Sequence, residues 1–197
     1  AFLSAEDKNF YKHGGVDPEG LVRAALTNFK SGKKQGASTI TQQVAKNFLL
    51  SNEQTFDRKI KEALIALRIE QAYSKDKILE LYLNEIFFGL NSYGIAGAAL
   101  TYFDKSVTEL TTAEAAYLAA LPKGPNNYHP FRHQQAALDR RNWVVDRMAE
   151  NGYITQMDAD DAKTQPLGVK QRRSGTHLFA SDYFSEEVRR QIIGRYG

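Results

Sequence analysis

Three stretches of the sequence carry polar side chains in patterns that could do chemistry. The first, EDKNFYKHGGVD from Glu6 to Asp17, places two adjacent carboxylates beside two aromatic residues and a histidine. A carboxylate beside aromatic rings can have its pKa raised, because burial disfavours the charged form. Such a group suits general acid or base catalysis near neutral pH. An acidic pair at a helix end with a surface histidine fits the same pattern, and the residues alone leave both interpretations open.

The second stretch, GASTITQQVAKN over residues 36–47, has small and hydroxyl residues at the start of a predicted helix. Thr39 and Gln42 have the spacing of a capping box. Four polar residues share one face of this helix, at about 100° per residue: Thr39, Gln43, Lys46 and Asn47. Free N–H groups at a helix start, with a lysine on the same face, can hold a phosphate. A capped surface helix with a solvated polar side is the alternative.

The third stretch, RKIKEALIALRIE over residues 58–70, groups two cations around one carboxylate. Arg58 and Glu62 are four residues apart and Lys59 is three residues from Glu62, so all three can meet on one helical face. Such a cluster keeps the glutamate ionised and could also bind a pyrophosphate. A salt-bridged surface helix has the same pattern.

The composition limits the class of protein. The chain has 197 residues, 42% hydrophobic and 25% charged, which is typical of a folded domain. The net charge of +3 fits an anionic partner without identifying one. The absence of cysteine excludes disulfides and thiolate metal sites. The chain lacks an apolar run of about 18 residues, a zinc or P-loop motif, and the full set of penicillin-reactive transpeptidase motifs.

The elements that must position these residues are predicted to be helices. Helix starts are indicated by capping residues and by proline after aspartate, and they fall at Asp17-Pro18, Thr39, Thr55, Ser74, Thr111, Thr155 and Ser185. A further helix is predicted around residues 140–150, with Trp143 on it. Apolar stripes are predicted on the helices after Asp17 and Thr55, including Leu26, Phe29, Ile60 and Leu64. No alternating strand pattern of useful length is found, so the predicted fold class is mainly α.

Taken in chain order, the three stretches and two later segments resemble the family 51 peptidoglycan glycosyltransferases. The three stretches above are similar to the first three family motifs. KDKILELYLNEIFFG over residues 75–89 and AAYLAALPKGPNNYHP over residues 115–130 are similar to the last two. The resemblance extends from about Phe2 to Lys163, and the spacing of Glu6 and Glu62 suits the pair of glutamates in the family.

The resemblance implies a lysozyme-like, mainly helical domain with two lobes, a head and a membrane-facing jaw, and a cleft between them. It implies that the protein polymerises lipid II by inverting transfer and releases undecaprenyl pyrophosphate. Glu6 is the expected general base and Glu62 the second catalytic residue. The residues expected to bind substrate are Asp7, Phe10, His13, Ser38, Thr39, Gln43, Lys46, Asn47, Arg58 and Lys59.

The resemblance also implies partners and a location. The expected partners are lipid II, the growing glycan strand, the membrane surface through the jaw, and moenomycin as an inhibitor, with no nucleic acid. No cofactor is expected to be required, and no metal ligands are predicted, although Mg²⁺ or Mn²⁺ could assist. The expected location is the periplasmic face of a bacterial inner membrane, with the anchor helix outside this chain.

The expected domain organisation has two parts. Residues 1–165 form the glycosyltransferase domain. Residues 166–197 resemble the connector that leads to a downstream transpeptidase region, absent from this chain, in class A penicillin-binding proteins of the 1a type.

Two other functions compete with this interpretation. A glycan-cleaving enzyme on a lysozyme-like fold would use one glutamate as an acid, but it has no need for the cations Lys46, Arg58 and Lys59. A catalytically silent module could bind anionic lipid, with Phe48-Leu49-Leu50 and Phe87-Phe88 at the interface. That function leaves Glu6 without a role.

Overall fold

The computed structural model describes residues 1–31, 38–49 and 55–170, and this part of the chain is mainly helical. In chain order the elements are α1 (Phe2–Glu6), α2 (Pro18–Ser31), α3 (Ile40–Leu49), α4 (Phe56–Ala72), α5 (Lys75–Glu85), β1 (Phe87–Gly89), β2 (Ser92–Tyr93), α6 (Ile95–Phe103), the 3-10 turn η1 (Val107–Glu109), α7 (Thr112–Ala120), α8 (Gln134–Glu150) and α9 (Gln156–Thr164). The predicted fold class, mainly α, is confirmed.

The predicted helix starts are confirmed where the structure describes them. The hydroxyl of Thr55 accepts from the Arg58 amide at 3.2 Å, and that of Ser74 accepts from the Lys77 amide at 3.3 Å. Thr39 and Gln42 form the predicted capping box. The Thr39 amide donates to Gln42 Oε1 at 2.9 Å, and the Gln42 amide donates to the Thr39 hydroxyl at 3.1 Å. Each bond satisfies a backbone N–H that lacks a partner within its helix, which fixes where the helix begins.

Helix α7 lies at the centre of the molecule. Its residues from Ala116 to Ala120 are fully buried, as expected for a helix that is apolar on all sides. One face packs with α6 and shares a core cluster with residues of α5 and β1, in which Tyr102 and Leu118 are buried. The other face packs with α8 and α9, where Val144 and Ala159 are buried. The small alanines allow the helices to approach closely on both faces.

Strands β1 and β2 form a two-stranded antiparallel hairpin that the sequence did not predict. With three and two residues, the strands are too short for an alternating pattern to be recognised. Leu90 and Asn91 connect them with φ angles of 47° and 55°, as a tight primed turn requires.

The apolar stripes of α2 and α4 face outward. On α2, Leu26 is 58% exposed and Phe29 is 92% exposed. On α4, Ile60 and Leu64 are exposed, and the buried side chains among those described on that helix are Glu62 and Ala66. The inward face of α4 therefore carries polar chemistry, which leaves its apolar face open.

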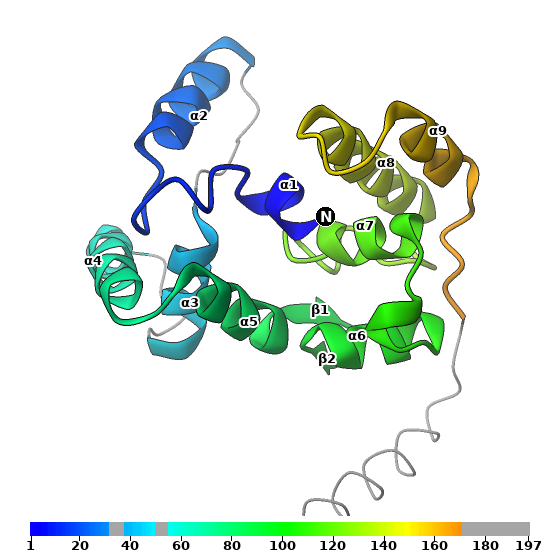
Figure 1. Cartoon of the computed structure of the whole chain (residues 1–197), viewed down its shortest axis with the longest axis horizontal. Helices are drawn as coiled ribbons and strands as arrows, with labels where there is room; N and C mark the ends of the chain where they lie inside the picture. Colours follow the sequence, from blue (N-terminus) through cyan, green and yellow to red (C-terminus); the bar gives the residue numbers. More distant parts are fainter. Residues whose placement is uncertain (32–37, 50–54, 171–197) are drawn as a thin grey trace, which may run out of the picture.

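Figure 1 shows how the helices surround the end of α1. Helix α1 packs on α7 and α8, while α3 packs on α4 and α5. Helix α2 extends at the rim, away from the centre (Figure 1). Glu6, the last residue of α1, is thereby set between the α7–α8 side and the α3–α4 side.

The chain stays packed beyond α9. Leu167 is buried in the core, and the Lys170 amide donates to the Tyr102 carbonyl at 3.1 Å. The rest of the predicted connector and the predicted helix at Ser185 lie outside the described residues. No helix in the described ranges is long and apolar enough to cross a membrane.

Candidate active site

Glu6 has a partner that the sequence did not predict. The Nε2 of Gln43, on α3, donates to Oε2 of Glu6 at 3.0 Å. Burial raises the pKa of Glu6, while the Gln43 hydrogen bond and the positive charges of Arg140 and Lys123 act in the opposite direction. A carboxyl whose pKa is raised toward neutrality is suited to take a proton from a substrate.

A cavity of about 340 Å³ opens beside Glu6, and we call it the basic cavity. It joins residues from α1, α3, α4, α8 and the loop before α8. Its lining is Ala5, Glu6, Ser38, Gln43, Lys46, Arg58, Lys59, Glu62, Lys123, Arg140 and Trp143. Five of these side chains are cationic and two are acidic, so the cavity suits a ligand with several negative charges.

Glu62 lies on the wall of the basic cavity and is almost completely buried. The ammonium of Lys59 contacts Glu62 Oε1 and also donates to Ser38 Oγ at 2.8 Å. The Arg58 guanidinium is 3.9 Å from Glu62 Oε2. Among the described residues, Nε and Nη1 of Arg58 have no hydrogen-bond partner. Arg58 is therefore held by charge, and two of its buried donors are left without a hydrogen-bond partner.

A second cavity, of about 240 Å³, shares Ala5, Glu6, Ser38 and Trp143 with the basic cavity. We call it the mixed cavity, because acidic and basic side chains line it in similar numbers. The rest of its lining is Ser4, Asp7, Lys8, Asp17, Gly20, Arg23, Ala24, Thr39, Arg147, Glu150 and Asn151. Glu6 borders both spaces, so it can contact a group held in either of them.

Helix α8 and the loop before it supply residues that the sequence analysis did not assign. Arg140 stacks on Trp143, with its guanidinium carbon 3.9 Å from the ring centroid. Arg147 lies 5.7 Å from the same ring. Lys123 belongs to the segment that resembles the fifth family motif, and that motif could have indicated it as a site residue. The spacing of Arg140, Trp143 and Arg147 on one helical face was a second signal.

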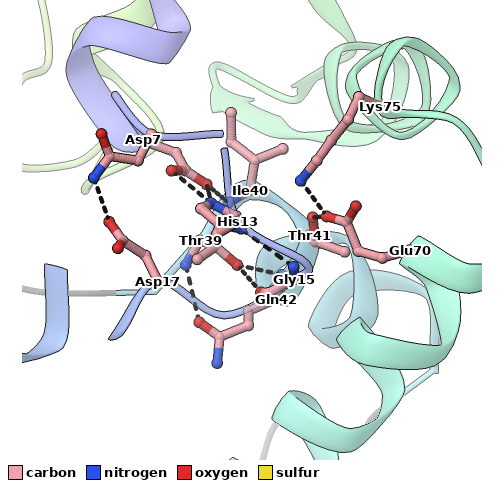
Figure 2. A network of polar contacts seen from close by, with 11 residues as sticks. Asp7, His13, Gly15, Asp17, Thr39, Ile40, Thr41, Gln42, Glu70 and Lys75 are labelled. Atoms are coloured by element: carbon pink, nitrogen blue, oxygen red, sulfur yellow. Dashed lines mark hydrogen bonds and ion pairs between the residues drawn. The ribbon is translucent and has the colours of Figure 1, made fainter. Parts of the chain in front are cut away.

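Figure 2 shows where Asp7 and His13 lie. The Nε2 of His13 is 3.0 Å from both carboxylate oxygens of Asp7. Asp7 also accepts from the backbone amide of Ile40, the first residue of α3, at 3.0 Å. Asp7 borders the mixed cavity, whereas His13 is not among the described residues that line either cavity.

Thr39 and Phe10 also make contacts inside the protein. The Thr39 hydroxyl donates to the Gly15 carbonyl at 2.5 Å (Figure 2). Phe10 is buried, and the ammonium of Lys75 lies 4.4 Å from its ring centroid. Of these two, Thr39 borders the mixed cavity, and Phe10 is absent from the described lining of both cavities.

The remaining predicted residues divide between the cavity wall and the surface. Ser38, Gln43, Lys46, Arg58 and Lys59 line the basic cavity. Asn47 is exposed on α3 and is not among the described lining residues. In residues 1–31, 38–49 and 55–170, no group of three or more His, Asp or Glu side chains could hold a metal ion.

Comparison with known proteins identifies the family. The model of the transglycosylase family matches residues 1–149. The chain belongs to the transglycosylase family. Penicillin-binding protein 1A of Aquifex aeolicus is 50% identical over 198 residues, which cover 100% of this chain and 27% of that protein. Penicillin-binding protein 1A of Escherichia coli is 48% identical, with 100% and 23% covered.

The crystal structure of penicillin-binding protein 1A from Haemophilus influenzae matches this transglycosylase with a TM-score of 0.46 and 32% identity, covering 80% of this chain and 20% of that one. The chain thus spans about a quarter of the length of the curated relatives. The predicted family is confirmed, and with it the enzyme class, a peptidoglycan glycosyltransferase, and the helical, lysozyme-like fold class.

Proposed function

We propose that the chain polymerises lipid II into glycan strands by inverting transfer and releases undecaprenyl pyrophosphate. The observation that carries the proposal is the position of Glu6. Its carboxyl has a raised pKa and borders both a strongly basic cavity and a second cavity of mixed charge. Two substrates can therefore meet at one candidate base.

The basic cavity is the proposed site of the donor pyrophosphate. Lys46, Arg58 and Lys59 come from α3 and α4, and Lys123 and Arg140 come from the α7–α8 side. A leaving pyrophosphate already carries stable negative charge, so the reaction needs cations and N–H donors more than a strong acid. Arg58 lines this cavity, and its unsatisfied donors Nε and Nη1 support a role for its guanidinium in that need. Glu62 holds Lys59 and Arg58 in place through its two oxygens.

The mixed cavity is the proposed site of the acceptor sugar. The 4-hydroxyl of the incoming lipid II gives its proton to Glu6, and its oxygen bonds to the anomeric carbon of the donor. The bond from that carbon to the pyrophosphate oxygen breaks, and the electron pair leaves with the lipid pyrophosphate. A positioned general base typically contributes about 10²–10⁴-fold to such a step.

No protein-held cofactor is part of the proposal. Mg²⁺ usually binds through phosphate oxygens and water with few protein carboxylates. If Mg²⁺ or Mn²⁺ assists, we expect it to bind the pyrophosphate of the substrate rather than a ligand set in the chain.

The proposed location is the periplasmic face of a bacterial inner membrane, where a lipid-linked substrate is reached from the bilayer surface. The open apolar side of α2, which includes Val22, Leu26 and Phe29, supports contact between the jaw and that surface. Moenomycin is the proposed inhibitor, in the donor position.

The proposed glycosyltransferase domain ends near residue 165, and the proposed connector toward a transpeptidase region follows. Packing supports a domain that includes α9, since Ala159 and Ala162 are buried against α7 and α8. Leu167 and Lys170, near the start of the proposed connector, both contact the domain.

The test is incubation of the protein with labelled lipid II, followed by separation of the products. The expected products are glycan polymer and undecaprenyl pyrophosphate. Cleavage of preformed glycan without polymer formation would favour the glycan-cleaving enzyme instead. Vesicle binding without turnover would favour the lipid-binding module. Calorimetry that finds no moenomycin binding would contradict the assignment of the donor site.

A further inference from the structure

We propose that His13 and Asp7 are positioning residues that fix α3 against α1, so that Gln43 reaches Glu6. The inference rests on the proposed role of Glu6 as the base. It gives these two residues a role different from the substrate contact that the sequence predicted for them. The contacts form a closed ring, from Asp7 to the start of α3 and from α3 back to Glu6.

The first contact fixes the tautomer of His13. The Gly15 amide donates to Nδ1 of His13 at 3.2 Å, so Nδ1 carries no proton. The proton of the neutral ring is then on Nε2, which donates to both oxygens of Asp7 at 3.0 Å. The side chains are 5% and 2% exposed. The carboxylate of Asp7 is therefore held in one orientation, away from solvent.

The second contact ties Asp7 to the start of α3. The Ile40 amide donates to Oδ2 of Asp7 at 3.0 Å. A carboxylate at a helix N-terminus satisfies a free N–H and interacts favourably with the helix dipole. Because Asp7 directly follows Glu6, this bond joins the end of α1 to the first residue of α3.

The loop that holds His13 makes a second tether to α3. Thr39 is the residue before α3, and its hydroxyl donates to the Gly15 carbonyl (Figure 2). Gly15 has a φ of +102°, and a Cβ there would lie 2.9 Å from the Ala66 carbonyl oxygen. Only glycine allows the loop to lie this close to α4. The loop thus holds the start of α3 through two links, one at the Thr39 hydroxyl and one that runs through His13 and Asp7 to the Ile40 amide.

The last contact returns to the base. Gln43 lies about one helical turn after Ile40 and donates to Oε2 of Glu6 at 3.0 Å. With the start of α3 locked, the amide of Gln43 is held at the carboxylate. This hydrogen bond favours the ionised form of Glu6, which is the form a base needs.

Other charged groups also act on Glu6, and their contributions have to be separated from that of Gln43. Arg140 on α8 and Lys123 in the loop before it favour the ionised form, while Asp7 opposes it. Tyr82 on α5 interacts with the Glu6 charge. The remaining charged side chains of the two cavities are Lys46, Arg58, Lys59, Glu62, Lys8, Asp17, Arg23, Arg147 and Glu150. Substitution of His13 leaves all of these side chains unchanged.

The test compares the pH dependence of kcat in the protein and its variants, with lipid II as substrate. In His13→Leu the donor to Asp7 is lost. We expect kcat to fall by about 10–100-fold, because a small displacement of catalytic groups has effects of this size. We also expect the acid limb of the kcat profile to move to higher pH. The same shift is expected in Gln43→Ala, which lacks the hydrogen bond to Glu6. The double variant should move it no further, since both changes release the same bond.

Two controls accompany the comparison. His13→Gln keeps a donor near the Nε2 position and should restore most of the activity and the position of the acid limb. His133→Leu removes an exposed histidine at the start of α8 and should match the wild type. If His13→Leu does not fold, His13→Asn replaces it, because its shorter amide does not reach Asp7 in the same way.

An acid limb that stays at the wild-type position in a folded His13 variant overturns the inference. Additive shifts in the double variant also overturn it. Glu6→Gln separates this inference from the proposed function. If Glu6→Gln is inactive and the limb of the His13 variant does not move, the positioning role alone is wrong. If Glu6→Gln polymerises like the wild type, both proposals are wrong.

Discussion

The side chain of Gln43 donates a 3.0 Å hydrogen bond to Glu6 across 37 positions of sequence. The bond joins the helix that lines the basic cavity to the residue that borders both cavities. The proposed donor site and the proposed base are thus part of one arrangement.

Lys59 bridges Ser38 and Glu62, so its removal should disturb the donor site. Lys59→Met keeps most of the apolar stem and removes the charge. We expect KM for lipid II to rise by about 10–100-fold, the size expected for a lost hydrogen bond to a charged group. Lys61→Met, on the exposed side of the same helix, is the matched control. Steady-state kinetics that give equal KM values for both variants would contradict the assignment.

Arg140 is predicted to help keep Glu6 ionised. Its positive charge lowers the pKa of Glu6 against the larger effect of burial. Arg140→Gln removes that charge, so the pKa of Glu6 rises. A base works only when ionised, and activity is lost as the pH falls through its pKa. The acid limb of kcat should therefore move to higher pH. Arg68→Gln, an exposed change on α4, should leave the limb in place, and the prediction is wrong if the two profiles coincide.

Glu6 is predicted to lower the stability of the fold at neutral pH. Burial raises its pKa above the ordinary value of 4.5, so the folded state binds the proton more tightly than the unfolded state. The stabilisation from protonated Glu6 is complete below pH 4.5 and is lost as the pH rises through the folded-state pKa. Glu6→Gln should therefore have a higher Tm than the wild type at pH 7, and the difference should shrink toward pH 4. Thermal melts with no such trend would contradict the desolvation of Glu6.

The open apolar side of α2 is predicted to bind lipid. Leu26→Gln with Phe29→Gln removes two exposed apolar side chains. We expect partition into phospholipid vesicles to fall by about 10-fold or more, given the free energy of burying such side chains. The fold should be unaffected because both residues are exposed. Met157→Gln, an exposed apolar residue on α9, is the control, and equal sedimentation of all three proteins with vesicles would argue against this surface.

Local features of the fold could be predicted from the sequence because their causes are local. Thr39 with Gln42, Thr55 and Ser74 mark helix starts through bonds that span three residues. The stripe on α4 shows the limit of such patterns. Ile60 and Leu64 have helical spacing, yet they face outward, and the charged Glu62 is buried instead. Periodicity identifies an apolar face but does not say what covers it.

The candidate site was only partly predictable for a similar reason. The glutamates and the cations of α3 and α4 belong to motifs, so the resemblance identified them. The Gln43–Glu6 bond and the ring that starts at His13 depend on how helices pack, which spacing along one helix does not give. Arg140 and Trp143 were missed because they join the cavity from a helix that begins far along the chain.

The most direct test of the central claim is polymerisation of labelled lipid II by wild type and Glu6→Gln. Glu80→Gln, an exposed glutamate paired with Lys77, is the matched control, and Lys46→Ala is measured alongside. We expect the wild type and Glu80→Gln to make polymer. We expect Glu6→Gln to fold and to bind moenomycin but to lose about 10²–10⁴-fold in rate. A Glu6→Gln protein that polymerises as fast as the wild type would contradict the assignment of Glu6 as the base.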